Sequence, residues 1–191
     1  MVLLLDILGS SFIGGILLLL VLKMNLFISS ARYDSDNELR MQQNAKTLAE
    51  IMNNDFRKIG YMEPGTSILA ADSKRFKFLG DLERPGQVGY GNIDTLEYYV
   101  TDSLTTGNSD EIVLVRVLNN NDSITGPSLG LVKLNFSYLD SLSSPTADLT
   151  KIRYIKTEFW VKPIDQVNNF VTGKKDSVFT YWEFTIYPRN I

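Results

Sequence analysis

The sequence has no cysteine and no histidine among its 191 residues. Without cysteine, the chain cannot hold a disulfide framework, a thiolate metal site or a cysteine nucleophile. Without histidine, it cannot use an imidazole to transfer a proton. The formal net charge of −3 argues against a general nucleic-acid binder, because phosphate contacts need a basic face. The composition leaves open carboxylate chemistry and roles that need no catalysis.

Charge is scarce at the start of the chain, where Asp6 and Lys23 are the two charged side chains among residues 1–30. Val2–Leu22 has Val, Leu, Ile or Phe at 15 of its 21 positions. As a helix this run would be about 31 Å long, the thickness of the hydrocarbon core of a bilayer. A cleavable secretory signal would need a basic region before the run and a small-residue cleavage site after it. The sequence shows neither feature, so we expect a retained membrane-embedded helix.

Two features of this run are unusual for a simple membrane anchor. A carboxylate at the bilayer centre costs about 3 kcal/mol. Asp6 therefore lies either at the water interface, near the positive end of the helix dipole, or beside a cationic partner in an assembly. Gly14 and Gly15 either let the helix bend or let another helix pack closely against it.

Helical periodicity continues after the apolar run. From Glu38 to Tyr61, six apolar residues recur at spacings of three and four and so share one helical face: Met41, Ala45, Leu48, Met52, Phe56 and Ile59. Gly60 and Pro64-Gly65 are the stop signals that follow. A single helix from the N-terminus would approach 90 Å, roughly, with a break within Ser29–Asp36 as the alternative. We expect the apolar face to pack on a folded domain.

From Ser67 onward the hydrophobic period changes to two, which is typical of half-buried strands. The alternation is clearest at Val132–Tyr138 and Trp182–Ile186. The other predicted strands are Arg75–Leu79, Thr95–Thr101, Glu111–Leu118 and Lys151–Val161, and the predicted loops are Arg84–Gln87, Thr106–Asp110, Asn119–Gly126 and Ser141–Ala147. Because no helical period interrupts these strands, we expect an antiparallel sheet.

The predicted fold is therefore α+β, with a long N-terminal α-helix packed on an antiparallel β-sheet head. The helix has a hydrophobic half and then an amphipathic half. We expect three parts: residues 1–30 as a transmembrane or filament-core helix, residues 31–62 as the amphipathic half of that helix, and residues 63–191 as a β-rich globular head.

This layout resembles that of type IV pilins and type II secretion pseudopilins, and most closely that of PilW-type minor pilins. The similar segments are Leu39–Ala45, the helix-ending pattern of Asp55–Tyr61 (acid, apolar, Arg, polar, apolar, Gly, Tyr), Asp94-Thr95-Leu96 before a strand, and the terminal Tyr187–Asn190. The N-terminus differs, because precursors of the family carry a short basic leader and a Gly-aromatic cleavage site that are not seen here.

The resemblance implies a pilin-like structural subunit, not an enzyme, that assembles through its N-terminal helix into a type IV pilus-like or pseudopilus filament. It implies further copies or other pilins as partners. It also implies the bacterial inner membrane before assembly and an extracellular or periplasm-spanning filament afterwards. Asp6 would neutralise the N-terminal amine of a neighbouring subunit, and Phe12, Gly14 and Gly15 would lie in the subunit contacts.

The residues also fit a second interpretation, in which the chain is a bitopic membrane protein. Its periplasmic α+β head would then bind a partner within a secretion or envelope complex, and the protein would never leave the bilayer.

No pattern predicts a catalytic residue, a metal, a cofactor, a small-molecule substrate or a nucleic-acid partner. Asp34, Asp36 and Glu38 are interpreted as a solvated helix surface. Asn119–Ser123 carries oxygen ligands that suit calcium but lacks the EF-hand pattern, so we interpret it as a turn. Lys174-Lys175 is interpreted as a solvated hairpin tip.

Overall fold

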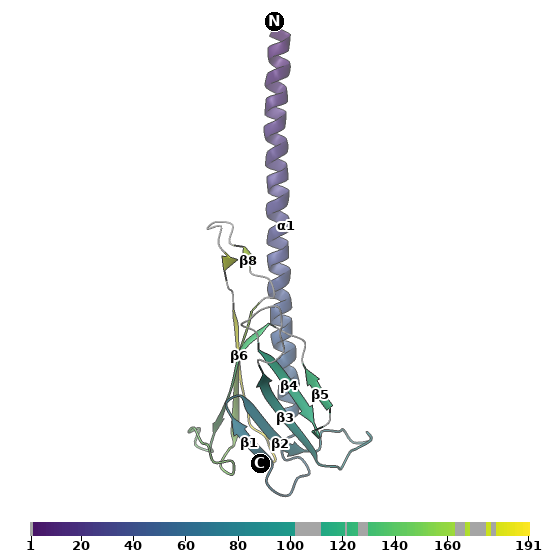
Figure 1. Ribbon diagram of the computed structural model, residues 1–191, viewed down its shortest axis with the longest axis vertical. Coiled ribbons are helices and arrows are strands. Elements are labelled where there is room, and N and C mark those ends of the chain that lie inside the picture. Colours follow the sequence, from purple (N-terminus) through teal and green to yellow (C-terminus); the bar gives the residue numbers. More distant parts are fainter. Residues whose placement is uncertain are drawn as a thin grey trace.

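The computed structural model describes residues 2–101, 112–120, 122–125, 130–162, 167–168, 175–176 and 179–191. Its first element is a single helix, α1 (Val2–Phe56), of 55 residues. At 1.5 Å per residue α1 is about 83 Å long, and its N-terminal part extends far beyond the strands (Figure 1). The helix is continuous through Ser29–Asp36 and through Gly14 and Gly15, so no break occurs at the weak points of the sequence.

α1 ends at Phe56, whereas the periodicity predicted that the helix continues to Ile59. The chain tightens after Phe56, because the N–H group of Lys58 donates to the carbonyl three residues earlier rather than four. Gly60 then adopts a φ of +71°, and a Cβ atom at this position would lie 2.3 Å from the carbonyl oxygen of Asn190. Glycine is therefore required in the turn that leads away from the helix.

After the helix, the described strands all pair in antiparallel fashion, with turns and loops between them. One sheet has the order β1-β2-β3-β4-β5, a second has the order β10-β7-β6, and β8 (Val167–Asn168) pairs with β9 (Lys175–Asp176). The other bounds are β1 (Ile68–Asp72), β2 (Arg75–Gly80), β3 (Asp94–Thr101), β4 (Val113–Leu118), β5 (Asp122–Thr125), β6 (Leu131–Leu139), β7 (Tyr154–Val161) and β10 (Thr180–Ile186). The predicted α+β fold is confirmed.

The six predicted strands correspond to β2, β3, β4, β6, β7 and β10, with ends that differ by a few residues; β7, for example, begins at Tyr154 rather than Lys151. β1 was not predicted, because its sequence ILAAD does not alternate and alanine has a low β propensity. The predicted loop Asn119–Gly126 is wrong over β5. Asn119 and Asn120 have φ values of 51° and 60°, which form a tight turn that returns the chain along β4. Glu111 and Thr106–Asp110 lie outside the described residues.

The two larger sheets meet at β1 and β6. The Tyr138 hydroxyl of β6 donates to the Asp72 carbonyl oxygen of β1 at 2.9 Å, and the Phe136 N–H group donates to the Ser73 carbonyl oxygen at 2.8 Å. α1 contacts β10, which lies at the other edge of the second sheet. The C-terminal part of α1 thus lies in a trough formed by the two sheets (Figure 1).

Phe56, the last residue of α1, lies at the centre of an aromatic cluster in this trough. Its fully buried ring makes edge-to-face contacts with Phe76, Phe78 and Tyr98 of the first sheet and Phe136 of the second, at centroid distances of 5.2 to 6.1 Å. This geometry is favourable for aromatic quadrupoles. The end of the helix is therefore fixed to both sheets at one point.

A buried ion pair fixes the same end of α1 to the first sheet. Asp55 is 5% exposed, and its Oδ2 atom accepts hydrogen bonds from Arg116 Nε of β4 at 2.8 Å and from the Tyr98 hydroxyl of β3 at 2.5 Å. Burial raises the pKa of Tyr98 well above its usual value, and the negative charge of Asp55 raises it further. Tyr98 therefore remains a donor at neutral pH.

We expect Asp55→Ala to lower the free energy of unfolding by about 2–4 kcal/mol, because Arg116 and Tyr98 would lose their acceptor in a largely buried site. Denaturant unfolding of the full chain in detergent measures this change. The neighbouring exposed Asn54→Ala serves as the control and should change stability by less than about 0.5 kcal/mol. Equal stability of the two variants would contradict the structural role of the pair.

Candidate functional site

The N-terminal half of α1 presents an exposed apolar surface. Large hydrophobic side chains are exposed from Ile7 to Ile28, by between 38% and 73%: Ile7, Leu8, Phe12, Ile13, Ile16, Leu17, Leu18, Leu19, Leu20, Val21, Leu22, Met24, Leu26, Phe27 and Ile28. Soluble monomers rarely expose a contiguous apolar surface of this extent. By length and composition α1 can cross a membrane.

The residues predicted for subunit contacts lie on this exposed surface. Asp6 is exposed near the N-terminal end of α1, and Phe12 is exposed about 1.7 turns later. A Cβ atom at Gly14 or Gly15 would meet no atom within 4 Å. Within the described residues, nothing in the chain itself requires glycine at these positions, and the straight helix shows no bend there. Close packing of another helix against this pair stays a prediction.

The residues predicted for helix-to-head packing lie in the core. Met41, Ala45, Leu48, Met52, Phe56 and Ile59 are each exposed by 7% or less and belong to the main hydrophobic cluster. Ile59 reaches the core from the turn after α1 rather than from the helix. Asp36 and Glu38 are exposed on α1, and Asp34 is half-buried. Lys175 lies in β9, and Lys174 lies outside the described residues.

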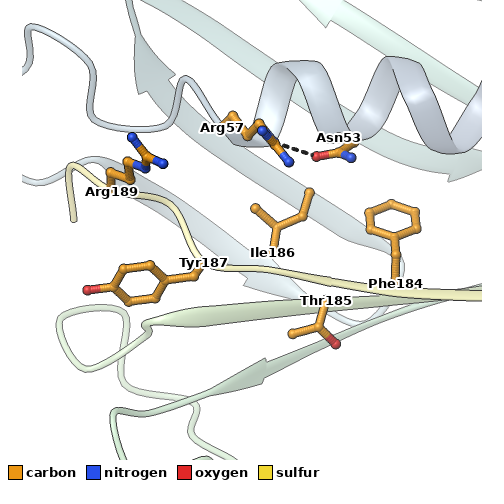
Figure 2. A pocket seen from close by; sticks show the side chains of 7 residues that line it. All are labelled: Asn53, Arg57, Phe184, Thr185, Ile186, Tyr187 and Arg189. Carbon is orange, nitrogen blue, oxygen red and sulfur yellow. Dashed lines mark hydrogen bonds between the residues drawn. The ribbon is translucent and has the colours of Figure 1, made fainter.

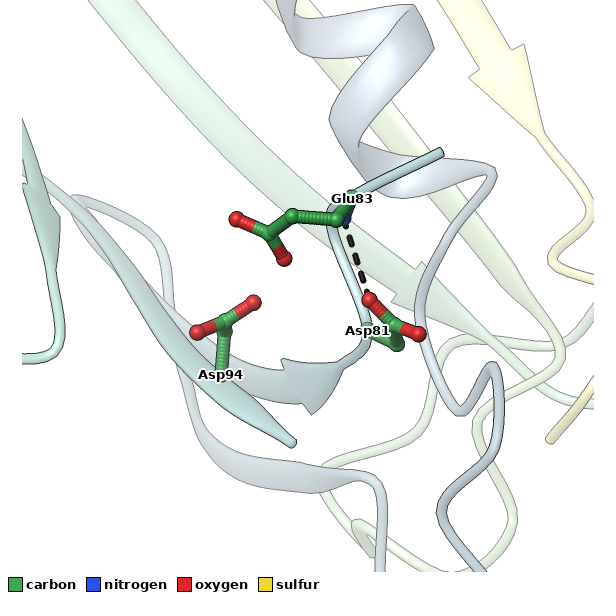
Figure 3. A group of neighbouring side chains, drawn as sticks. All are labelled: Asp81, Glu83 and Asp94. Carbon is green, nitrogen blue, oxygen red and sulfur yellow. Dashed lines mark hydrogen bonds between the residues drawn. The ribbon is translucent and has the colours of Figure 1, made fainter. Parts of the chain in front are cut away.

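Three carboxyl groups meet at one end of the β2–β3 hairpin: Asp81, Glu83 and Asp94 (Figure 3). Their oxygens lie within 4.8 Å of one another. The buried Asp81 accepts from the N–H groups of Glu83 at 3.1 Å and Gly91 at 2.7 Å. Asp94 is also buried and accepts from the side-chain amide of Asn119 at 2.7 Å. Two of the three carboxylates are therefore stabilised by fixed donors.

Glu83 differs from the other two carboxyl groups, because its buried Oε2 atom has no hydrogen-bond donor. Two carboxyl groups can form a hydrogen bond only if one of them carries a proton. The hydrogen bond between Glu83 and Asp94 therefore favours the protonated form of Glu83 and raises its pKa. Burial and the negative charge of Asp94 raise this pKa further. Carboxylate oxygens are also ligands for hard cations such as Ca²⁺, which takes about six to eight of them. The cluster can thus hold a proton, or contribute three ligands to a cation.

Sequence spacing did not reveal this cluster, although a signal for it exists. Asp81 and Glu83 follow the end of β2, and Asp94 begins β3, where it pairs with Gly80. The two strands of a hairpin are antiparallel, so the end of the first lies beside the start of the second. Acidic residues just after the first strand and at the start of the second therefore lie close together.

A groove lies between the end of α1 and β10, which is an edge strand of the second sheet in the described residues (Figure 2). Its volume is about 560 Å³. It is lined by residues 184–187, by Arg189, and by Asn53 and Arg57 of α1. Arg57 Nε donates to Asn53 Oδ1 at 2.9 Å. Arg57 belongs to Asp55–Tyr61 and Arg189 belongs to Tyr187–Asn190, which are two of the four segments that carry the family resemblance. The fold brings these two segments together at the groove.

The fold is similar to that of a type IV-like pilin from Thermus thermophilus, with a TM-score of 0.52 and 9% sequence identity, over 79% of this chain and 97% of that chain. Neither a family model nor a curated protein matches the sequence. At this identity the likeness shows the fold alone. The pilin-like fold is thereby confirmed, whereas the narrower likeness to PilW-type minor pilins stays a prediction from the sequence.

We expect Glu83→Gln to change how stability depends on pH. Because the folded-state pKa of Glu83 is raised, its contribution is greatest below the unfolded value of about 4.3 and is lost as pH rises through the folded value. The wild-type melting temperature should therefore fall relative to that of Glu83→Gln as pH rises above about 4.5. Glu38→Gln, on the exposed helix, is the matched control.

Parallel pH profiles for the wild type and Glu83→Gln would contradict this assignment. The same melting curves with added calcium and with chelator identify a cation in the cluster. In that case calcium would stabilise the wild type more than Glu83→Gln, because the variant lacks one of the three carboxylate ligands.

Proposed function

We propose that this chain is a pilin-like structural subunit that assembles through the N-terminal half of α1 into a type IV pilus-like or pseudopilus filament. The chain would reside in the bacterial inner membrane before assembly. It would then join an extracellular or periplasm-spanning filament made of further copies or of other pilins. The observation that carries the proposal is the exposed apolar surface of α1 on a chain with a pilin-like fold.

This exposed apolar surface needs surroundings that cover every side of the helix. The exposed large hydrophobic side chains between Ile7 and Ile28 point to every side of the helix, so one neighbouring surface cannot cover them. Lipid can surround the helix before assembly, and a bundle of like helices can surround it afterwards. Gly14 and Gly15 would allow such helices to approach closely.

Electron microscopy of material sheared from cells that express the full chain tests this proposal. We expect filaments whose core consists of parallel N-terminal helices. If the chain is found only in membranes and yields isolated particles in detergent, the alternative of a bitopic protein with a partner-binding head is correct instead.

Asp6 would pair with the N-terminal amine of a neighbouring subunit, because a carboxylate within an apolar helix bundle needs a cationic partner. We expect Asp6→Ala to reduce the amount of sheared filament by about tenfold or more while the membrane content of the protein stays constant. Quantitative immunoblots of both fractions measure this, with Asp36→Ala on the exposed part of α1 as the control. An unchanged filament yield for Asp6→Ala would disprove this role.

A further inference from the structure

β10 presents an unpaired strand edge to the groove. The second sheet has the order β10-β7-β6, so among the strands that the structure describes β10 pairs only with β7. Half of its backbone N–H and C=O groups therefore point away from the sheet. Across the groove lies the end of α1 (Figure 2), where the carbonyl groups of Asn53, Asp55 and Phe56 already accept from the N–H groups of the turn that follows the helix. The groove thus offers main-chain donors and acceptors that α1 cannot satisfy.

The groove is also positively charged. Arg57 and Arg189 both line it, and both are exposed. Arg57 Nε is bonded to Asn53, which leaves the terminal nitrogens of its guanidinium as donors. Neither arginine forms an ion pair with another residue in the part of the chain that the structure describes. None of the lining residues is acidic, so the charge of the groove is not balanced locally.

The size of the groove suits a short extended segment. Residues 184–187 of its wall span about 13 Å as a strand. Phe184 and Ile186 point toward α1 and form an apolar floor, whereas Thr185 points away (Figure 2). A segment paired with the edge of β10 would lie beside these side chains, which stand at about right angles to the main-chain hydrogen bonds. It would also lie near the two arginines that line the groove.

From the free edge and the unbalanced arginines, we propose that this groove binds an extended acidic segment of a partner protein, which adds to β10 as an antiparallel or parallel strand. Main-chain hydrogen bonds supply affinity in this mode of recognition, and side-chain contacts supply specificity. Arg57 and Arg189 select carboxylates, because guanidinium groups bind them with two parallel hydrogen bonds. This interaction is separate from the helix contacts of the proposed filament.

The test measures the binding of labelled peptides to the full chain in detergent by fluorescence anisotropy. The probe is a seven-residue peptide that alternates glutamate and valine. We expect saturable binding of this peptide and at least about tenfold weaker binding of two relatives, one with lysine in place of glutamate and one with methylated backbone nitrogens. The first comparison tests the charge, and the second tests the strand pairing at unchanged charge.

The protein variant for this test is Arg57→Gln with Arg189→Gln, and its matched control is Arg40→Gln with Arg84→Gln, which removes the same charge from exposed positions outside the groove. We expect at least about tenfold weaker binding for the first variant and no change for the second. Three results would overturn the proposal: no saturable binding, equal binding of the methylated peptide, or equal binding by the two variants. Filament formation is measured separately, so either proposal can fail alone.

Discussion

The helix is longer than the part of it that the head buries, and the rest of the structure depends on this difference. α1 has 55 residues, and its buried apolar side chains begin at Met41. Between Ile7 and Ile28 the helix is mostly apolar and exposed, and no part of the described chain covers its large hydrophobic side chains. Apolar surface of this extent is strongly unfavourable in water, so another phase or another molecule has to bury it. The head does not bury this apolar surface. It fixes the direction in which the N-terminal half of α1 extends.

The head controls this direction through the end of α1. Phe56 is packed between rings from both sheets, and the neighbouring Asp55 is bonded to Arg116 and Tyr98 of the first sheet. These contacts lie within one turn of the helix end. A continuous helix that is fixed at one end behaves as a rigid arm, so assembly through its far end would set the position of the head. The groove beside β10 and the acidic cluster after β2 are then presented at defined places on the head.

The sequence was informative wherever a periodic pattern reports burial. The three-and-four spacing from Met41 to Phe56 and the alternation in β6 and β10 follow from one buried face, and both predictions match the structure. β1 and β5 lacked this signal, because ILAAD does not alternate and β5 is a short strand that follows Asn119 and Asn120, both with positive φ values. The contacts of Asp55, the Asp81–Glu83–Asp94 cluster and the Arg57–Arg189 groove depend on strand register and on packing between distant segments. A local pattern cannot report such contacts.

The most direct test of the account is the environment of Leu17 before and after assembly. Since the chain has no native cysteine, Leu17→Cys carries a spin label at a single site. Its accessibility to oxygen and to a water-soluble relaxation agent then reports lipid, protein or water around the helix. We predict high oxygen accessibility in membranes and a marked decrease in sheared filaments, with low accessibility to the water-soluble agent in both. A label that stays in lipid in every fraction of the cell would contradict the account.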